Sequence, residues 1–101
     1  MSFKFTQSDD FVSLDVAIRN HLPKVIKNRI KEFEDFRLSF MAKDFGEIAH
    51  YCHKVRGVAA CYGLYKLEEI VEYIHKAAKE SDSSKIDDAF PKLNAYFESL
   101  K

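Results

Sequence analysis

The sequence has few of the residues that reverse a chain. Its 101 residues include three glycines, two prolines, two cysteines and no tryptophan. Strands and hairpins are bounded by clusters of glycine, proline and similar turn residues, so this scarcity argues against a sheet. No repeat, low-complexity segment or linker divides the chain. We therefore predict a single domain over residues 1–101, without a sheet.

An excess of charge of either sign is also missing. Sixteen basic and sixteen acidic residues give a formal net charge of zero. Nucleic-acid binders and polybasic membrane anchors carry a positive surplus, so we expect neither function. Hydrophobic residues make up 47% of the sequence and charged residues 32%, which is typical of a folded protein. A protein partner or a small ligand is the expected interaction.

Long apolar runs are absent as well. The first ten residues lack the apolar core of a signal peptide, and the longest uncharged run, residues 57–65, is far shorter than a membrane span of roughly 18 residues. Cys52 and Cys61 lie nine positions apart, which on one helix is about 13.5 Å along the axis and too far for a disulfide. Free thiols are usual in a reducing compartment, so we expect a cytoplasmic protein.

Apolar residues instead recur with the spacing of amphipathic helices. Four segments show this pattern: residues 22–41, 45–62, 67–78 and 86–100. Gly63 follows the second segment at a position typical of a helix end, and Pro91 lies inside the last, where it predicts a kink. Residues 9–21 are expected to form a shorter helix, although their apolar pattern is less regular.

Short connections between these segments favour antiparallel neighbours in space. We therefore predict an all-α fold, namely an antiparallel up-down-up-down four-helix bundle with a short extra N-terminal helix. The bundle covers roughly residues 22–100. Such a scaffold does not by itself indicate a function.

One face of the helix predicted over residues 45–62 carries small residues around a histidine. On a helical wheel of about 100° per residue, His53 points roughly 130° away from the apolar stripe, towards solvent. Its neighbours on this face, here called the small-residue stripe, are Gly46, Ala49, Gly57 and Ala60. Solvated helix faces usually carry long charged side chains, so the small-residue stripe indicates a docking surface.

The residues at His53 suit phosphoryl transfer. A neutral imidazole is a nucleophile at physiological pH and can accept a phosphoryl group. Arg56 follows three positions later, and its cation can stabilise the added charge of roughly −1.5 to −2. No glycine-rich loop followed by Lys-Ser or Lys-Thr occurs, so we expect no nucleotide site and a donor that comes from outside.

The segment HKVRGVAACYG resembles the signature of histidine phosphotransfer domains. In that family the phosphoacceptor histidine is followed three residues later by Lys or Arg, then by Gly, with a second Gly at the helix end. The matching residues are His53, Arg56, Gly57 and Gly63. The flanking sequence is also similar, so the resemblance covers roughly residues 22–100. Arg56 stands where many members have Lys, which keeps the charge and changes the hydrogen-bond geometry.

This resemblance implies a phosphorelay carrier of a two-component system. Its His53 takes a phosphoryl group from an aspartate of a response-regulator receiver domain, which can belong to a hybrid sensor kinase, and passes it to another such aspartate. The family implies no kinase activity and no cofactor in the carrier itself, because Mg²⁺ sits on the receiver domain. We expect the chain to be a monomer.

Other interpretations remain open from the sequence. A relative of the same fold could bind a receiver domain through the small-residue stripe without accepting phosphate. An acid–base or hydrolytic enzyme would use His53 and Arg56, but no carboxylate or serine is placed beside them by the sequence. A metal site at His50 and His53 is disfavoured, because Cys52 belongs to the core stripe. For His21, His50 and His75 we predict no role.

Overall fold

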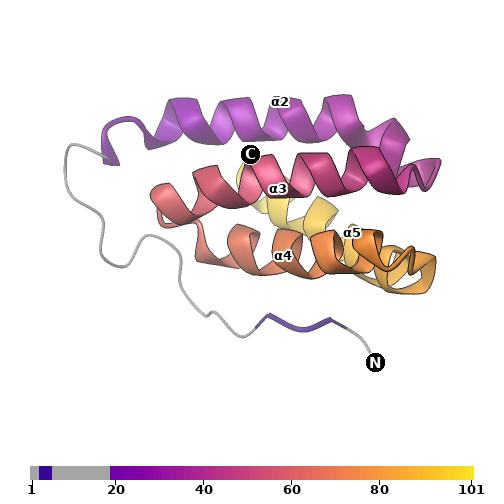
Figure 1. Ribbon diagram of the computed structural model, residues 1–101. Coiled ribbons are helices and arrows are strands. Elements are labelled where there is room, and N and C mark those ends of the chain that lie inside the picture. Colours follow the sequence, from indigo (N-terminus) through magenta and orange to yellow (C-terminus); the bar gives the residue numbers. More distant parts are fainter. Residues whose placement is uncertain (1–2, 6–18) are drawn as a thin grey trace.

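The protein is all-α in the part that the structure describes. The computed structural model describes residues 3–5 and 19–101. Four helices follow one another there: α2 (Leu22–Met41), α3 (Phe45–Cys61), α4 (Tyr65–Lys79) and α5 (Ser83–Ser99) (Figure 1). These residues contain no strand, so the predicted all-α class is confirmed. The helix predicted over residues 9–21 falls mainly on residues 6–18, which lie outside the described residues.

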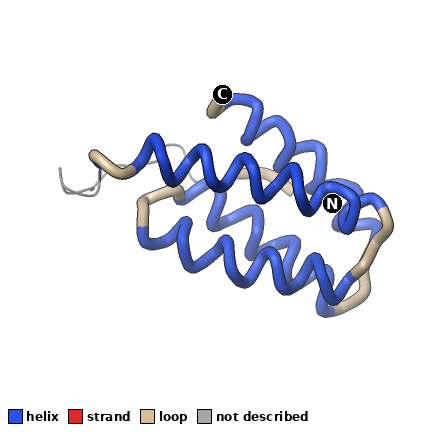
Figure 2. The backbone as a smooth tube through the Cα atoms, turned by 90° about the horizontal axis from the view of Figure 1, so that it is seen from above, coloured by secondary structure: helices blue, strands red, loops and turns tan. Residues whose placement is uncertain are grey.

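The three connections between helices have the same backbone conformation. Each contains a residue with positive φ, at Lys43 (55°), Gly63 (70°) and Ser81 (53°). The residue after each of these donates its backbone N–H to a carbonyl five positions back, the pattern of a Schellman motif. Figure 2 shows the resulting short loops in tan between the blue helices. The predicted helix-ending role of Gly63 is thereby confirmed.

The helices pack against each other around one apolar core. Most of its side chains are no more than 1% exposed, and the largest include Phe33, Phe40, Tyr51, Phe97 and Ile48. The rings of Phe33 on α2 and Phe97 on α5 stack with their centroids 4.7 Å apart. α3 packs chiefly on α4, whereas α2 lies against both α3 and α5. This arrangement leaves one face of α3 uncovered.

α5 remains helical through Pro91, which is exposed. The proline therefore does not break the helix, as expected from its place in the apolar pattern. No helix in the described part of the chain is long and apolar enough to cross a membrane.

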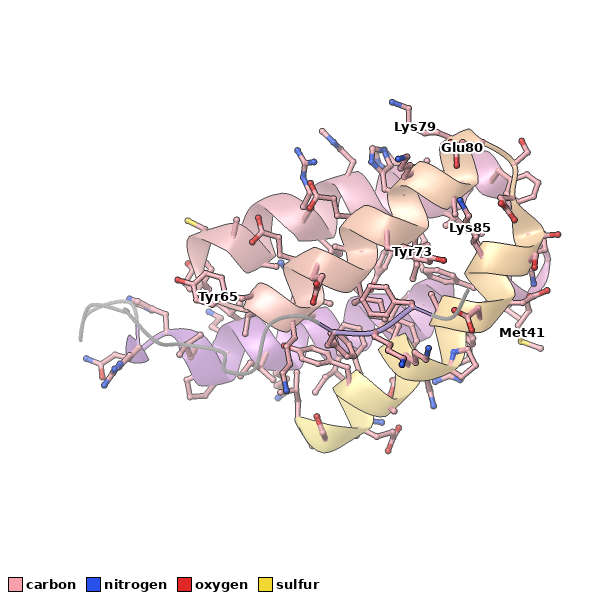
Figure 3. All side chains as sticks on the ribbon, turned by 90° about the horizontal axis from the view of Figure 1, so that it is seen from below. Met41, Tyr65, Tyr73, Lys79, Glu80 and Lys85 are labelled. Atoms are coloured by element: carbon pink, nitrogen blue, oxygen red, sulfur yellow. The ribbon has the colours of Figure 1, made fainter. Side chains whose placement is uncertain are left out.

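The first described residues add a contact that the sequence did not predict. Phe3 is 7% exposed, and its ring centroid lies 5.0 Å from that of Tyr73 on α4. Its backbone N–H donates to the Asp88 carboxylate at 2.6 Å, and its carbonyl accepts from the Lys92 ammonium. Figure 3 shows this segment beside the labelled Tyr73. The core thus extends beyond the predicted range of residues 22–100.

Candidate functional site

His53 lies near the middle of α3, on the face turned away from the core. The helix begins at an aspartate cap, because the Asp44 carboxylate accepts a hydrogen bond from the Glu47 backbone N–H at 3.3 Å. Cys52 and Val55 are fully buried beneath the same stretch of α3, whereas His53 is exposed. The outward orientation predicted for His53 is therefore confirmed.

The small-residue stripe lies beside His53 as predicted, with one difference. Gly46, Gly57 and Ala60 are exposed, whereas Ala49 is half-buried and packs against the core. A Cβ atom added at Gly57 would meet nothing within 4 Å, and one added at Gly46 would make an ordinary contact at 3.8 Å with the Asp44 carboxylate. The surface one turn after His53 is thus open to an approaching molecule.

Arg56 has a partner that the sequence did not reveal. Its Nη1 atom lies 3.2 Å from the Glu72 Oε1 atom on α4, and the two side chains are 41% and 60% exposed. An ion pair this exposed contributes about 0–1 kcal/mol, because water screens both charges. The guanidinium therefore rests against α4 and can leave that position at little cost.

His75 is the second residue that the structure brings to this site. Its ring on α4 lies beside that of His53, with centroids 6.0 Å apart and planes inclined by 43°. His75 is half-buried, and this burial lowers its pKa from the ordinary value of 6.5. Electrostatic interactions with Lys79, His53 and Arg56 lower the pKa of His75 further, and the interaction with Glu72 raises it. The expectation that His75 has no role at the site overlooked this contact.

A signal in the sequence could have found both α4 residues. α3 and α4 form a hairpin that turns at Gly63 and Leu64, so residues equally far before and after the turn face each other. His53 and His75 each lie eleven positions from Leu64. Arg56 and Glu72 each lie eight positions from it. Pairing residues at equal sequence distances before and after the predicted helix end would have placed His53 beside His75 and Arg56 beside Glu72.

The remaining two histidines, His21 and His50, and the two cysteines form no metal cluster with His53 in the described residues. Cys52 is fully buried under α3, and burial raises the pKa of its thiol well above the usual range. It therefore cannot complete a surface metal site with His50 and His53. Both cysteines are free, and Cys61 is exposed. No group of three or more metal-ligating side chains occurs among residues 3–5 and 19–101.

Two hollows on the surface lie away from His53. One, of about 450 Å³, is lined by residues of the first half of α2 and by Leu100. The other, of about 290 Å³, lies where the end of α2 meets α5 and includes Phe40 and Phe90. Neither of these two hollows contains a residue of α3.

Lys54 on α3 and Lys79 on α4 are the lysines nearest in sequence to His53 and His75 on their own helices, apart from Lys76. Lys54 on α3 is exposed and pairs with Glu32 of α2, with the Nζ and Oε2 atoms 3.3 Å apart. Lys79 ends α4 and is labelled in Figure 3. Each of the two histidines therefore has a lysine close to it on its own helix, one position after His53 and four positions after His75.

Comparisons with protein-family profiles, with curated proteins and with solved structures give no significant match to this chain.

Proposed function

We propose that this chain is a phosphohistidine carrier in a phosphorelay. His53 accepts a phosphoryl group from the aspartyl phosphate of a response-regulator receiver domain and passes it to the aspartate of another receiver. The proposal takes the four helices as an antiparallel up-down-up-down bundle and the cytoplasm as the compartment. The observation that carries it is the exposed imidazole of His53 beside the open surface at Gly57.

The transfer step needs no group beyond the two reactants and the Mg²⁺ of the receiver. The unprotonated ring nitrogen of neutral His53 attacks phosphorus, and the bond from phosphorus to the aspartyl oxygen breaks. The aspartate leaves with the electron pair as a carboxylate. The imidazole keeps the proton on its other nitrogen, so the ring carries one positive charge and the phosphoryl group two negative charges. Total charge is conserved at two negative charges.

Shape and charge both support an external donor. A receiver aspartate lies on a folded domain, so the acceptor must stand on a surface that this domain can approach closely. The small-residue stripe provides such a surface, since Gly57 and Ala60 have no side chain beyond Cβ to hold the partner away. Arg56 is close to His53 along α3 and is held only by an exposed ion pair, so it can turn towards the phosphoryl oxygens.

Phosphotransfer assays with phosphorylated receiver domains of the same organism test the proposal. We expect label on the parent protein that is lost in acid and stable in base, as a phosphoramidate requires. His53→Gln should abolish the label. His50→Gln is the matched control, because His50 is also exposed on α3 and should be dispensable. Full labelling of the His53→Gln variant would refute the assignment.

The same assay separates the carrier from the interaction module of the same fold. Such a module would bind a receiver domain through the small-residue stripe without accepting phosphate. Binding of a receiver, measured by calorimetry, together with an absence of label on the parent protein would favour that function over the one proposed.

A further inference from the structure

The pair of imidazoles at the α3–α4 surface is more than phosphoryl acceptance requires. One exposed histidine is enough for a nucleophile, yet His75 lies in ring contact with His53 at 6.0 Å. His75 comes from another helix and is half-buried, so its position is fixed by the packing of α4. Its ring can therefore respond to what happens at His53 without itself being displaced.

The charges around His75 favour the neutral ring while His53 is free. Burial lowers its pKa, and so do Lys79 on its own helix and His53 and Arg56 on α3. Glu72, also on α4, is the one carboxylate that favours protonation. No charged group of α2 or α5 is among these influences in the described part of the chain. The environment is thus positive on balance.

A phosphoryl group on His53 reverses this balance. The phosphoryl charge of roughly −1.5 to −2 outweighs the one positive charge on the phosphorylated His53 ring, so the net charge added beside His75 is negative. Opposite charge nearby favours the protonated form of an imidazole. Arg56 is also drawn away from His75 if it turns to the phosphoryl oxygens. Each of these changes raises the pKa of His75.

We propose that His75 is the proton-linked partner of the phosphoryl group, neutral beside free His53 and protonated beside phosphorylated His53. This inference rests on the proposed function, and it adds that phosphorylation of the carrier depends on pH. The step is proton uptake from solvent onto a ring nitrogen of His75, and no bond of the phosphoryl group changes. His75 acts as a positioning and charge-compensating residue and not as a second acceptor.

The sign of the effect follows from linkage. Between the two titration points of His75, the phosphorylated protein binds one proton more than the free protein, so a fall in pH favours the phosphorylated form. The net added charge, one to two negative charges at about 6–8 Å from the protonated His75 ring, corresponds to roughly two- to tenfold in an equilibrium constant at the dielectric constant of water. Above both titration points the effect disappears.

The first experiment follows His75 directly and does not depend on a receiver. A His21→Gln, His50→Gln background leaves two histidines, and phosphoramidate serves as the chemical donor. Titration of the ring signals by ¹H–¹⁵N NMR should show His75 titrating at higher pH once His53 is phosphorylated. An unchanged titration of His75 would overturn the inference while leaving the proposed function intact.

The second experiment measures the equilibrium of transfer between a phosphorylated receiver and the carrier at pH 6 and pH 8.5. The result is expressed as the equilibrium constant of the parent divided by that of His75→Gln. Proton uptake by the phosphoryl groups is the same in both proteins and therefore drops out of this ratio. This ratio should be close to one at pH 8.5 and should rise towards about two to ten as the pH falls to 6 and below. A ratio that does not change with pH would contradict the proposal.

The His75→Lys variant distinguishes an effect of the charge at position 75 from a purely structural role of His75. His75→Lys places a permanent cation at the same position on α4, so it should favour the phosphorylated carrier at both pH values. Loss of the effect in His75→Gln with no recovery in a folded His75→Lys variant would show that the charge is not the cause. Failure of every receiver to label the parent would instead count against the proposed function, and the NMR result would stand separately.

Discussion

Substitutions at Gly57 should separate the stability of α3 from access to His53. A glycine inside a helix costs about 1 kcal/mol relative to alanine, because the unfolded chain has more freedom to lose. The structure shows no reason in packing for that cost, since Gly57 is exposed and an added Cβ would meet nothing within 4 Å. Gly57→Ala should therefore stabilise the free protein by about 1 kcal/mol.

The expected shift in melting temperature follows from the size of the domain. For a domain of 60–100 residues, 1 kcal/mol corresponds to roughly 4–8 °C. Gly57→Gln should give a smaller gain, because glutamine is a slightly weaker helix former than alanine. Thermal unfolding followed by far-ultraviolet circular dichroism measures both shifts.

Phosphotransfer should respond in the opposite sense. Side chains on a helix lean towards its N-terminus, so a glutamine at position 57 would point over the turn that carries His53. We expect transfer about twofold slower in Gly57→Ala and at least about tenfold slower in Gly57→Gln, because the centre of an interface tolerates little intrusion. A stabilised Gly57→Gln variant that transfers at the parent rate would refute the reasoning.

Gly63 is the matched control within the same motif. Its φ of 70° lies in the left-handed region, where alanine is strained by about 1–2 kcal/mol. Gly63→Ala should therefore lower the melting temperature by several degrees, the reverse of Gly57→Ala. Gly63 is buried at the turn and away from the small-residue stripe, so transfer well below the melting temperature should stay close to the parent rate.

Two further predictions concern Arg56 and the thiols. Arg56→Ala should slow transfer by roughly ten- to thirtyfold, and Arg56→Lys should keep most of the parent rate. Glu72→Gln should speed transfer by up to about fivefold, because it releases the guanidinium from its exposed ion pair. Equal rates in the Ala and Lys variants would show that the positive charge is not what matters. Ellman's reagent should modify Cys61 in the native protein and Cys52 only after unfolding, because Cys52 is fully buried and burial raises its thiol pKa. Release of two equivalents from the native protein would place Cys52 differently.

The helices could be predicted because their causes are local. Apolar spacing along the chain set the four segments, and Gly63 marked the end of one helix through the backbone conformation that it allows. The packing of Phe3 could not be predicted in this way. Its partners Tyr73, Asp88 and Lys92 lie at least seventy positions further along the chain, and no periodicity links residues so far apart.

In the candidate site, too, the features set within one helix could be predicted, and those set by the packing of two helices could not. The exposure of His53 and Gly57 follows from the rotation of one helix, which the sequence specifies. The neighbours His75 and Glu72 depend on how α4 is set against α3, and this register is a property of the turn between them. Helix patterns fix which face of α4 is buried but not how far along α3 each of its residues lies.

The turn at Gly63 therefore has a consequence beyond ending a helix. The hydrogen bond of 2.9 Å from the Leu64 N–H to the Ala59 carbonyl closes the turn and fixes where α4 begins. An additional residue in this loop would shift the sequence of α4 by one position, which on a helix is a rotation of about 100° for every side chain. The alternative is that the loop adopts a different conformation and accommodates the extra residue. His75 would then leave His53, while His53 and the small-residue stripe on α3 would remain exposed. The second glycine of the motif is thus tied to the site through the register of α4, and the proposed acceptance on α3 and the proposed proton linkage from α4 can be tested separately.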